Sequence, residues 1–236
     1  KFNKFDYFLT NSLIDKIKLK KKKVNSIFFG CISFDLSKSL LKEKSKKKTI
    51  LFLGVNSRNN FFKGIDLKNC CYELIDFFLK KNYLVYFQPH PRSPLDVSKY
   101  LNNKSFFLNK KPNRKKFKPE FCVSIMSASL LEMASRKIKT ILYLPNDLIS
   151  NSSSKDPDTI KNINLNTNTP YLAKYSYWAK NKSDLEYILL NKDTCFLKLI
   201  KNFDDDFKSY NSSLKLIKFI ENIFDKKNIL NLKNLN

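Results

Sequence analysis

Short apolar runs alternate with helical patterns along the middle of this 236-residue chain, and this alternation limits the folds that it can adopt. The segment TILFLGV at 49–55 is almost continuously apolar, which is typical of a strand buried on both faces. The segment at 66–81 that follows places its leucines, cysteines and phenylalanines on one face of a helix. A strand, a helix and a second strand at 83–89 predict a βαβ unit with parallel strands.

The same alternation continues to residue 145. Two further apolar runs at 121–126 and 140–145 predict strands, and SASLLEMASRK at 127–137 predicts the helix between them. We therefore expect an α/β fold, a Rossmann-like parallel sheet of at least four strands with helices on both faces. Ligands of such sheets bind beyond the carboxyl ends of the strands.

Residues outside this alternation predict the domain boundaries. Residues 1–45 hold two short aromatic strand patterns and a charged hinge, so we interpret them as the end of an amino-terminal domain and a linker. Residues 46–225 form the Rossmann-like domain with two closing helices, and residues 226–236 are a tail. Because the first residue is Lys1 and not methionine, we interpret the chain as a piece of a longer protein.

The chain is strongly basic, with 45 Lys and Arg against 21 Asp and Glu, a formal net charge of +24. Such a charge attracts polyanions, including anionic lipid. An AT-rich coding bias would also give a chain rich in lysine and poor in glycine, of which there are only three. Since no lysine run interleaves aromatic residues as nucleic-acid stacking platforms do, nucleic acid is not an expected partner.

The five cysteines include no CxxC pair, and the chain has a single histidine. We therefore expect no metal site. The odd number of cysteines indicates a reducing compartment, so the expected location is the cytoplasm, either free or peripheral at the inner face of the membrane. No run of about 18 apolar residues predicts a membrane-spanning helix.

Polar residues follow two of the predicted strands. His90 and Arg92 in FQPHPRS come directly after one strand, and Ser127 and Ser129 come after another, at the start of a helix. Imidazole, guanidinium and hydroxyl groups all bind phosphate, and the first turn of a helix offers unpaired amides. These four residues predict a phosphate site. The alternative is a structural one, in which Ser129 caps the helix and Glu132 completes a capping box.

The order of FFGCISFD, TILFLG, QPHPRS and PEFCVSIMSASLLEMASRKIKTILYLP resembles the carboxyl-terminal half of GT-B glycosyltransferases that build bacterial surface polysaccharides. The resemblance covers residues 26–145. It is nearest to bacterial sialyltransferases and polysialyltransferases, with their HP and serine motifs, and to the CDP-glycerol glycerophosphotransferases of teichoic-acid synthesis. In these families the carboxyl-terminal domain binds a nucleotide-activated donor.

The resemblance implies that residues 46–225 bind the nucleotide donor and assigns roles to the polar residues. His90, Ser127 and Ser129 would contact the donor phosphate, with Arg92 beside them, and Glu132 would lie near the ribose or base. His90 would also be catalytic as a general acid toward that phosphate, because a free imidazole titrates near neutral pH. The implied partners are the donor and a polysaccharide or lipid-linked acceptor, and no cofactor or metal is required.

Two departures from the family pattern matter. The acidic D/E-D/E-G motif that supplies the acceptor-activating base in sialyltransferases is missing, so we expect the base in a part of the protein that precedes this chain. The HP dipeptide also occurs in UDP-N-acetylglucosamine 2-epimerases, whose serine motif is rich in glycine, unlike SIMSASLLE here.

The function predicted from the sequence is a glycosyltransferase with a CMP- or CDP-linked donor in capsular or other surface polysaccharide synthesis. Three alternatives stay open: a CDP-glycerol-type glycerophosphotransferase, an epimerase, and a non-catalytic basic module that binds polyanions.

Overall fold

The computed structural model describes residues 8–10, 13–24, 26–28, 46–55, 67–91, 94–108, 118–125, 127–144, 163–164, 169–207 and 212–233. The chain divides into two compact units. The first unit joins residues 1–38 to residues 203–236, and the second unit comprises residues 39–202. The boundaries 1–45, 46–225 and 226–236 drawn from the sequence stay a prediction.

The second unit holds the large sheet. Its strands are β3 (Lys46–Leu53), β4 (Leu84–Gln88), β5 (Phe106–Leu108), β6 (Pro119–Ser124), β7 (Lys139–Tyr143) and β10 (Tyr177–Ala179). Its helical elements are α3 (Leu67–Lys80), η3 (Ser98–Tyr100), α4 (Ser129–Ser135), η4 (Tyr171–Lys174), α7 (Lys182–Leu190) and the first part of α8 (Phe196–Phe207). β8 (Ile163–Asn164) and β9 (Thr169–Pro170) form a separate antiparallel pair.

All six strands of the large sheet are parallel, in the order β10-β7-β6-β3-β4-β5. This confirms the Rossmann-like α/β fold and the four strands predicted from the sequence. The sequence did not reveal β5 and β10, which lie at the two edges of the sheet. Each of them has three residues, too few to give a recognisable apolar run.

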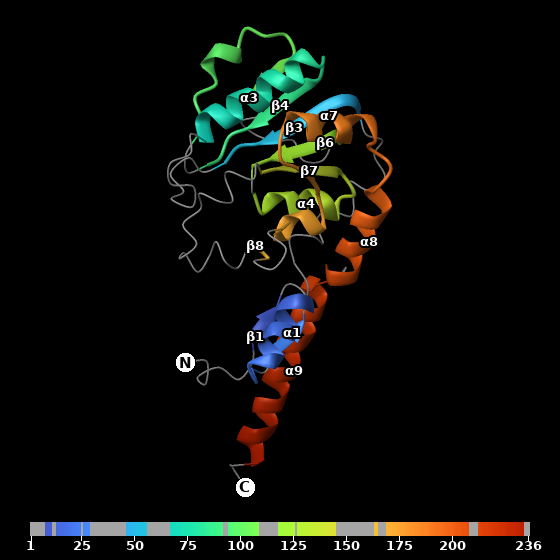
Figure 1. Cartoon of the computed structure of the whole chain (residues 1–236). Helices are drawn as coiled ribbons and strands as arrows, with labels where there is room; N and C mark the ends of the chain where they lie inside the picture. Colours follow the sequence, from blue (N-terminus) through green and yellow to red (C-terminus); the bar gives the residue numbers. More distant parts are fainter. Residues whose placement is uncertain are drawn as a thin grey trace. The chain divides into compact units, whose positions relative to one another are not determined.

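The strand order reverses in the middle of the sheet, between β3 and β6. From β3 the chain passes through α3 to β4 on one side, whereas from β6 it passes through α4 to β7 on the other side. Because such crossovers are right-handed, α3 and α4 cover opposite faces. Figure 1 shows α3 beside β4 and α4 beside β7, with β3 and β6 between the two helices.

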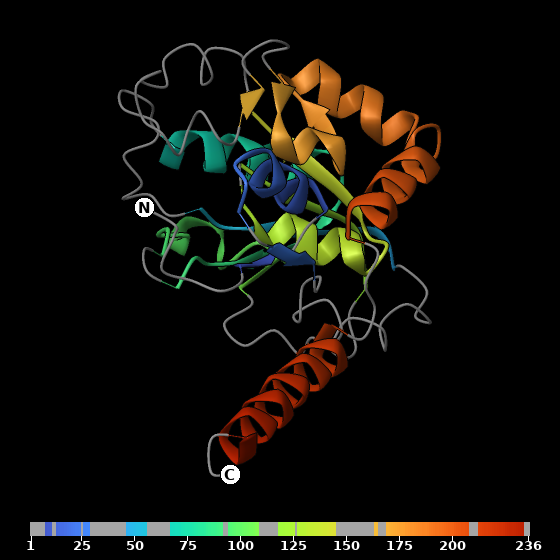
Figure 2. The same ribbon diagram turned by 90° about the horizontal axis from the view of Figure 1, so that it is seen from below.

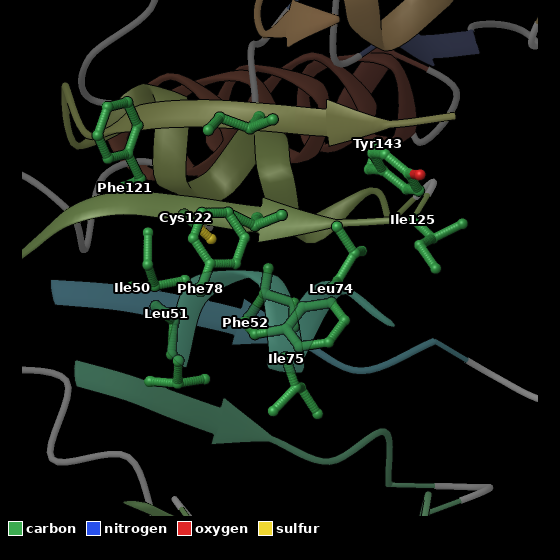
Figure 3. Packing of buried hydrophobic residues seen from close by; sticks show 14 of the residues in the cluster. Ile50, Leu51, Phe52, Leu74, Ile75, Phe78, Phe121, Cys122, Ile125 and Tyr143 are labelled. Carbon is green, nitrogen blue, oxygen red and sulfur yellow. The ribbon is translucent and has the colours of Figure 1, made fainter. Parts of the chain in front are cut away.

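The core forms around β3, which is buried on both faces: Ile50, Leu51, Phe52 and Leu53 are at most 7% exposed. Register pairs Phe52 with Phe87 on one side and Val123 on the other, so these side chains share one face. The phenylalanine rings meet edge to face at 5.5 Å. Figure 3 shows apolar side chains of β3, β6 and α3 that belong to one buried cluster: Ile50, Leu51, Phe52, Phe121, Cys122, Leu74, Ile75 and Phe78.

A buried carboxylate lies at the amino end of β6. Glu120 accepts hydrogen bonds from the Lys48 amide at 2.6 Å and from the Lys192 ammonium group at 2.5 Å. Its own amide donates to the Thr49 hydroxyl at 3.1 Å. Lys192 lies in the turn between α7 and α8, and its carbonyl accepts a hydrogen bond from the Tyr177 hydroxyl. This network ties the turn to three strands.

The smaller unit contains β1 (Phe8–Thr10), α1 (Leu13–Lys21) and β2 (Ser26–Phe28), and its two strands are parallel. The two short strands predicted at the start of the sequence are therefore present, with a helix between them. The unit also contains the rest of α8, where the rings of Phe203 and Phe207 stack at 4.7 Å, and α9 (Ser212–Lys233). Figure 2 shows α9 as one continuous helix. No helix in the described ranges is long and apolar enough to cross a membrane.

Lysine occupies a left-handed position at the end of α4. Lys137 has φ 54°, and the next amide, from Ile138, returns to the Met133 carbonyl at 3.2 Å, a helix ending that usually takes glycine. A non-glycine residue there costs about 1–2 kcal/mol, and glycine loses about 0.5–1 kcal/mol in backbone entropy. We expect Lys137→Gly to raise the free energy of unfolding by about 0.5–1 kcal/mol, measured by urea denaturation.

The matched control for this variant is Lys80→Gly, in the last turn of α3. A glycine in an ordinary helical position should lower the free energy of unfolding by about 0.5–1 kcal/mol. If both glycines destabilise the protein, Lys137 carries no strain that glycine relieves.

Burial together with the nearby Glu120 charge raises the pKa of Tyr83 to about 12. An unfolded tyrosine titrates near 10, so between about pH 10 and 12 the unfolded chain releases a proton that the folded protein retains. The stability contributed by protonated Tyr83 is complete below pH 10 and is lost as the pH rises through this window. In urea denaturation at pH 9 and pH 11, the drop in unfolding free energy should be smaller for Tyr83→Phe than for the natural chain. Equal drops would contradict the assignment.

Candidate functional site

The sequence-predicted histidine and serines follow neighbouring parts of one sheet edge. β4 ends at Gln88, two residues before His90, and β6 ends at Ser124, three residues before Ser127. Leu53 of β3 is paired with Gln88 on one side and with Ser124 on the other. The two strand ends are therefore separated by two strand spacings, about 10 Å.

This edge is where the order of the sheet reverses. The chain continues from β3 to β4 on one side and from β6 to β7 on the other side. In open parallel sheets, a crevice forms outside the carboxyl ends of the strands at such a reversal, and ligands bind in it. The loop of His90 and the turn of Ser127 flank this point, one on each side of β3. The candidate site is therefore the carboxyl edge at β4, β3 and β6.

Gly54 brings the end of β3 against the His90 loop. Its amide donates to the Gln88 carbonyl at 2.8 Å, extending the pairing of the two strands by one residue. A Cβ on Gly54 would lie 3.0 Å from the His90 amide nitrogen, 3.1 Å from the Gln88 carbonyl oxygen and 3.2 Å from Cζ of Phe87. The His90 backbone is thus packed closely, and its side chain is half-buried.

The Ser127 turn leads into α4. The Ser127 hydroxyl accepts the Ser129 amide at 3.3 Å, and its carbonyl accepts the Leu130 amide at 3.0 Å. The Leu131 amide donates to the Ala128 carbonyl at 3.0 Å. The expectation that the first turn offers unpaired amides is therefore wrong for these three amides. What the turn presents is hydroxyl groups, half-buried on Ser127 and exposed on Ser129.

The Glu132 side chain interacts with another residue of α4. Its carboxylate pairs with the buried Arg136 guanidinium at 2.6 Å, one helical turn later. The N-cap of α4 is Ala128, without a side-chain cap, so the alternative of a capping box from Ser129 to Glu132 is also wrong. The carboxylate is held by a helix neighbour, and its role toward a ribose or base stays a prediction.

Two other expectations concern Arg92 and metal ions. Arg92 lies outside the described residues. Over the described ranges, no group of three or more histidine, cysteine or acidic side chains could hold a metal ion.

Cys122 lies on β6 and is fully buried. Burial raises the pKa of its thiol, so Cys122 remains a protonated core residue.

Sequence reasoning missed two residues at this edge. The Ser124 hydroxyl is buried and donates to the Leu53 carbonyl at 2.9 Å, which fixes β6 to β3 where they meet the site. Gly54 was read only as the end of a strand. Its position directly after a buried strand, in a chain with three glycines, was the available signal.

The fold and this edge define a Rossmann-like α/β domain with a candidate ligand site at the carboxyl edge of its sheet. The sequence matches no protein-family model and no curated protein.

Solved structures of the wall teichoic acid polymerase TagF are similar to the chain. One is 15% identical with a TM-score of 0.57 and covers 96% of this chain and 59% of TagF. A histidine variant is 16% identical with a TM-score of 0.58, and that variant soaked with CDPG is 15% identical with a TM-score of 0.56. Each of these two covers 98% of this chain and 60% of TagF. At such identities the likeness is one of fold, and the chain spans about three fifths of the TagF structures.

Proposed function

We propose that the chain is the donor-binding part of a transferase that uses a CDP- or CMP-activated donor to build a cell-surface polymer. The observation that carries this proposal is the position of the single histidine, across β3 from a serine turn, at the reversal point of a sheet that is similar to that of TagF. The TagF structures include one soaked with CDPG (CDP-glycerol), which supports a cytidine donor.

Glycerophosphate transfer and glycosyl transfer both require this edge of the sheet to stabilise the leaving nucleotide. In glycerophosphate transfer, an acceptor hydroxyl attacks the outer phosphorus, and CMP leaves with the electron pair of the broken P–O bond. In glycosyl transfer, the acceptor attacks the anomeric carbon, and the nucleotide leaves with the electron pair of the C–O bond. Negative charge develops on the nucleotide phosphate in both reactions, and groups that stabilise this charge accelerate transfer.

In this proposal, His90 and Ser127 meet that phosphate from opposite sides of β3. His90 donates a proton or a hydrogen bond to the departing phosphate oxygen. The Ser127 hydroxyl already accepts the Ser129 amide, which leaves its hydrogen to be donated to the phosphate. Ser129 and Arg92 complete the phosphate contacts, and Glu132 lies toward the ribose or base.

The remaining parts of the reaction lie outside these residues. The proton of the acceptor hydroxyl passes to a base that these residues do not supply. The acceptor is a surface polysaccharide or its lipid-linked precursor, and the formal charge of +24 favours peripheral contact with an anionic membrane. The donor requires no metal, because histidine, arginine and hydroxyl groups stabilise the leaving phosphate.

The first test uses the single histidine as a reporter. In the chain labelled with ¹³C-histidine and carrying no histidine tag, one imidazole signal is expected, without any need for assignment. Added CDP or CMP should move this signal saturably, because the phosphate binds beside the ring. Uridine diphosphate, which differs from CDP only in the base, should bind more weakly than CDP. An imidazole signal that CDP and CMP leave unmoved would contradict the donor-site assignment.

Two variants control this titration. Ser127→Ala removes a phosphate ligand and should weaken CDP binding by about tenfold, the value of one hydrogen bond to a charged group. Lys104→Ala changes an exposed lysine in the β4–β5 connection and should leave binding nearly unchanged. If both variants weaken binding equally and added salt abolishes it, the chain is the basic polyanion-binding module.

The second test measures catalysis in the full-length protein. His90→Ala should reduce transfer from a CDP or CMP donor on the order of 10²-fold or more, because proton donation to the leaving group is lost. The melting temperature should stay within a few degrees, since a half-buried loop residue supports little core. Parallel measurement of transfer rate and melting temperature separates the two effects, and retained activity would make the histidine structural. Conversion of UDP-N-acetylglucosamine to its manno epimer without an acceptor would identify the epimerase instead.

A further inference from the structure

We propose that Gly54 is a positioning residue for His90, a role that rests on the proposed function of this edge. Gly54 touches no reacting group in this proposal. It determines where the backbone of the His90 loop lies, and the loop determines where the imidazole lies. The proposal extends the site to β3, the strand between the histidine and the serine turn.

A Cβ on Gly54 would make contacts tighter than most side chains make. Two of the three atoms that a Cβ would meet are backbone atoms of the loop, the His90 nitrogen at 3.0 Å and the Gln88 oxygen at 3.1 Å. The third is Cζ of Phe87 at 3.2 Å, in a ring with 0% exposure. None of these is the end of a flexible side chain. A methyl group would therefore press on the loop backbone, where its neighbours have to give by a few tenths of an ångström, and the closest atom belongs to His90.

The loop has little freedom to absorb this shift. Pro89 and Pro91 restrict the backbone on both sides of His90, and Gln88 is held by the Gly54 amide at 2.8 Å. A displacement of a few tenths of an ångström at the His90 nitrogen is thus transmitted to its side chain. Misplacement of a catalytic group by about 1 Å can cost on the order of 10² in rate.

The test is Gly54→Ala, read first in the free protein through the single imidazole signal. We expect this signal to move from its natural position before any nucleotide is added. CDP affinity should fall by about tenfold or more, and transfer in the full-length protein by up to about 10²-fold. An unmoved imidazole signal together with unchanged CDP affinity would overturn the proposal.

Phe87→Leu is the matched control. It loosens the core at the same place, through the third contact atom, without pressing on the His90 backbone. We expect a lower melting temperature with the imidazole signal and the CDP affinity of the natural chain. If this variant moves the signal as far as Gly54→Ala does, the effect comes from loosened packing and the positioning role is wrong.

A second variant keeps the test decisive if Gly54→Ala does not fold. The double variant Gly54→Ala with Phe87→Leu relieves the ring contact and retains both backbone contacts. Its imidazole signal should still be displaced relative to Phe87→Leu alone, and a coincident signal would overturn the proposal. The two proposals fail separately. Absence of CDP and CMP binding by the natural chain contradicts the proposed function, whereas the imidazole position in the free variants tests Gly54 alone.

Discussion

The burial of β3 on both faces is the constraint on which the rest of this structure depends. A central parallel strand has no solvent-facing side, so helices must cover it above and below. The chain meets this requirement by leaving β3 toward β4 and β6 toward β7, with α3 and α4 on opposite faces. The reversal between β3 and β6 is a consequence of this arrangement, and it brings the histidine loop and the serine turn to one edge of the sheet.

Most of this framework could be predicted from the sequence because its central strands are long, apolar and separated by a helix of clear periodicity. The edge strands β5 and β10 could not, since three residues are too short to show a pattern and the register with a neighbour defines them. The capping at α4 was mispredicted for a related reason. Which amide a serine satisfies depends on where the helix begins. The helix begins at Ser129 with Ala128 as its cap, one residue earlier than a capping box starting at Ser129 requires.

The candidate site divides in the same way. His90 and Ser127 could be found because imidazole and hydroxyl groups after predicted strands indicate chemistry. The sequence marks Gly54 only as a rare glycine after a buried strand. Its role becomes visible only when the His90 and Gln88 backbone atoms are known to lie within 3.1 Å of the missing Cβ. Ser124 belongs to the same class, since its hydroxyl contacts a carbonyl 71 residues earlier.

The Glu120 network also bears on the order in which the protein is assembled during synthesis. Glu120 and Lys192 are 72 residues apart, so a chain emerging from the ribosome exposes the glutamate well before its lysine exists. Until then, the start of β6 carries a carboxylate whose burial is unfavourable without the opposite charge. The ion pair at the amino end of β6 can therefore form only after α7 has been made, so this part of the sheet gains its full set of contacts late in synthesis.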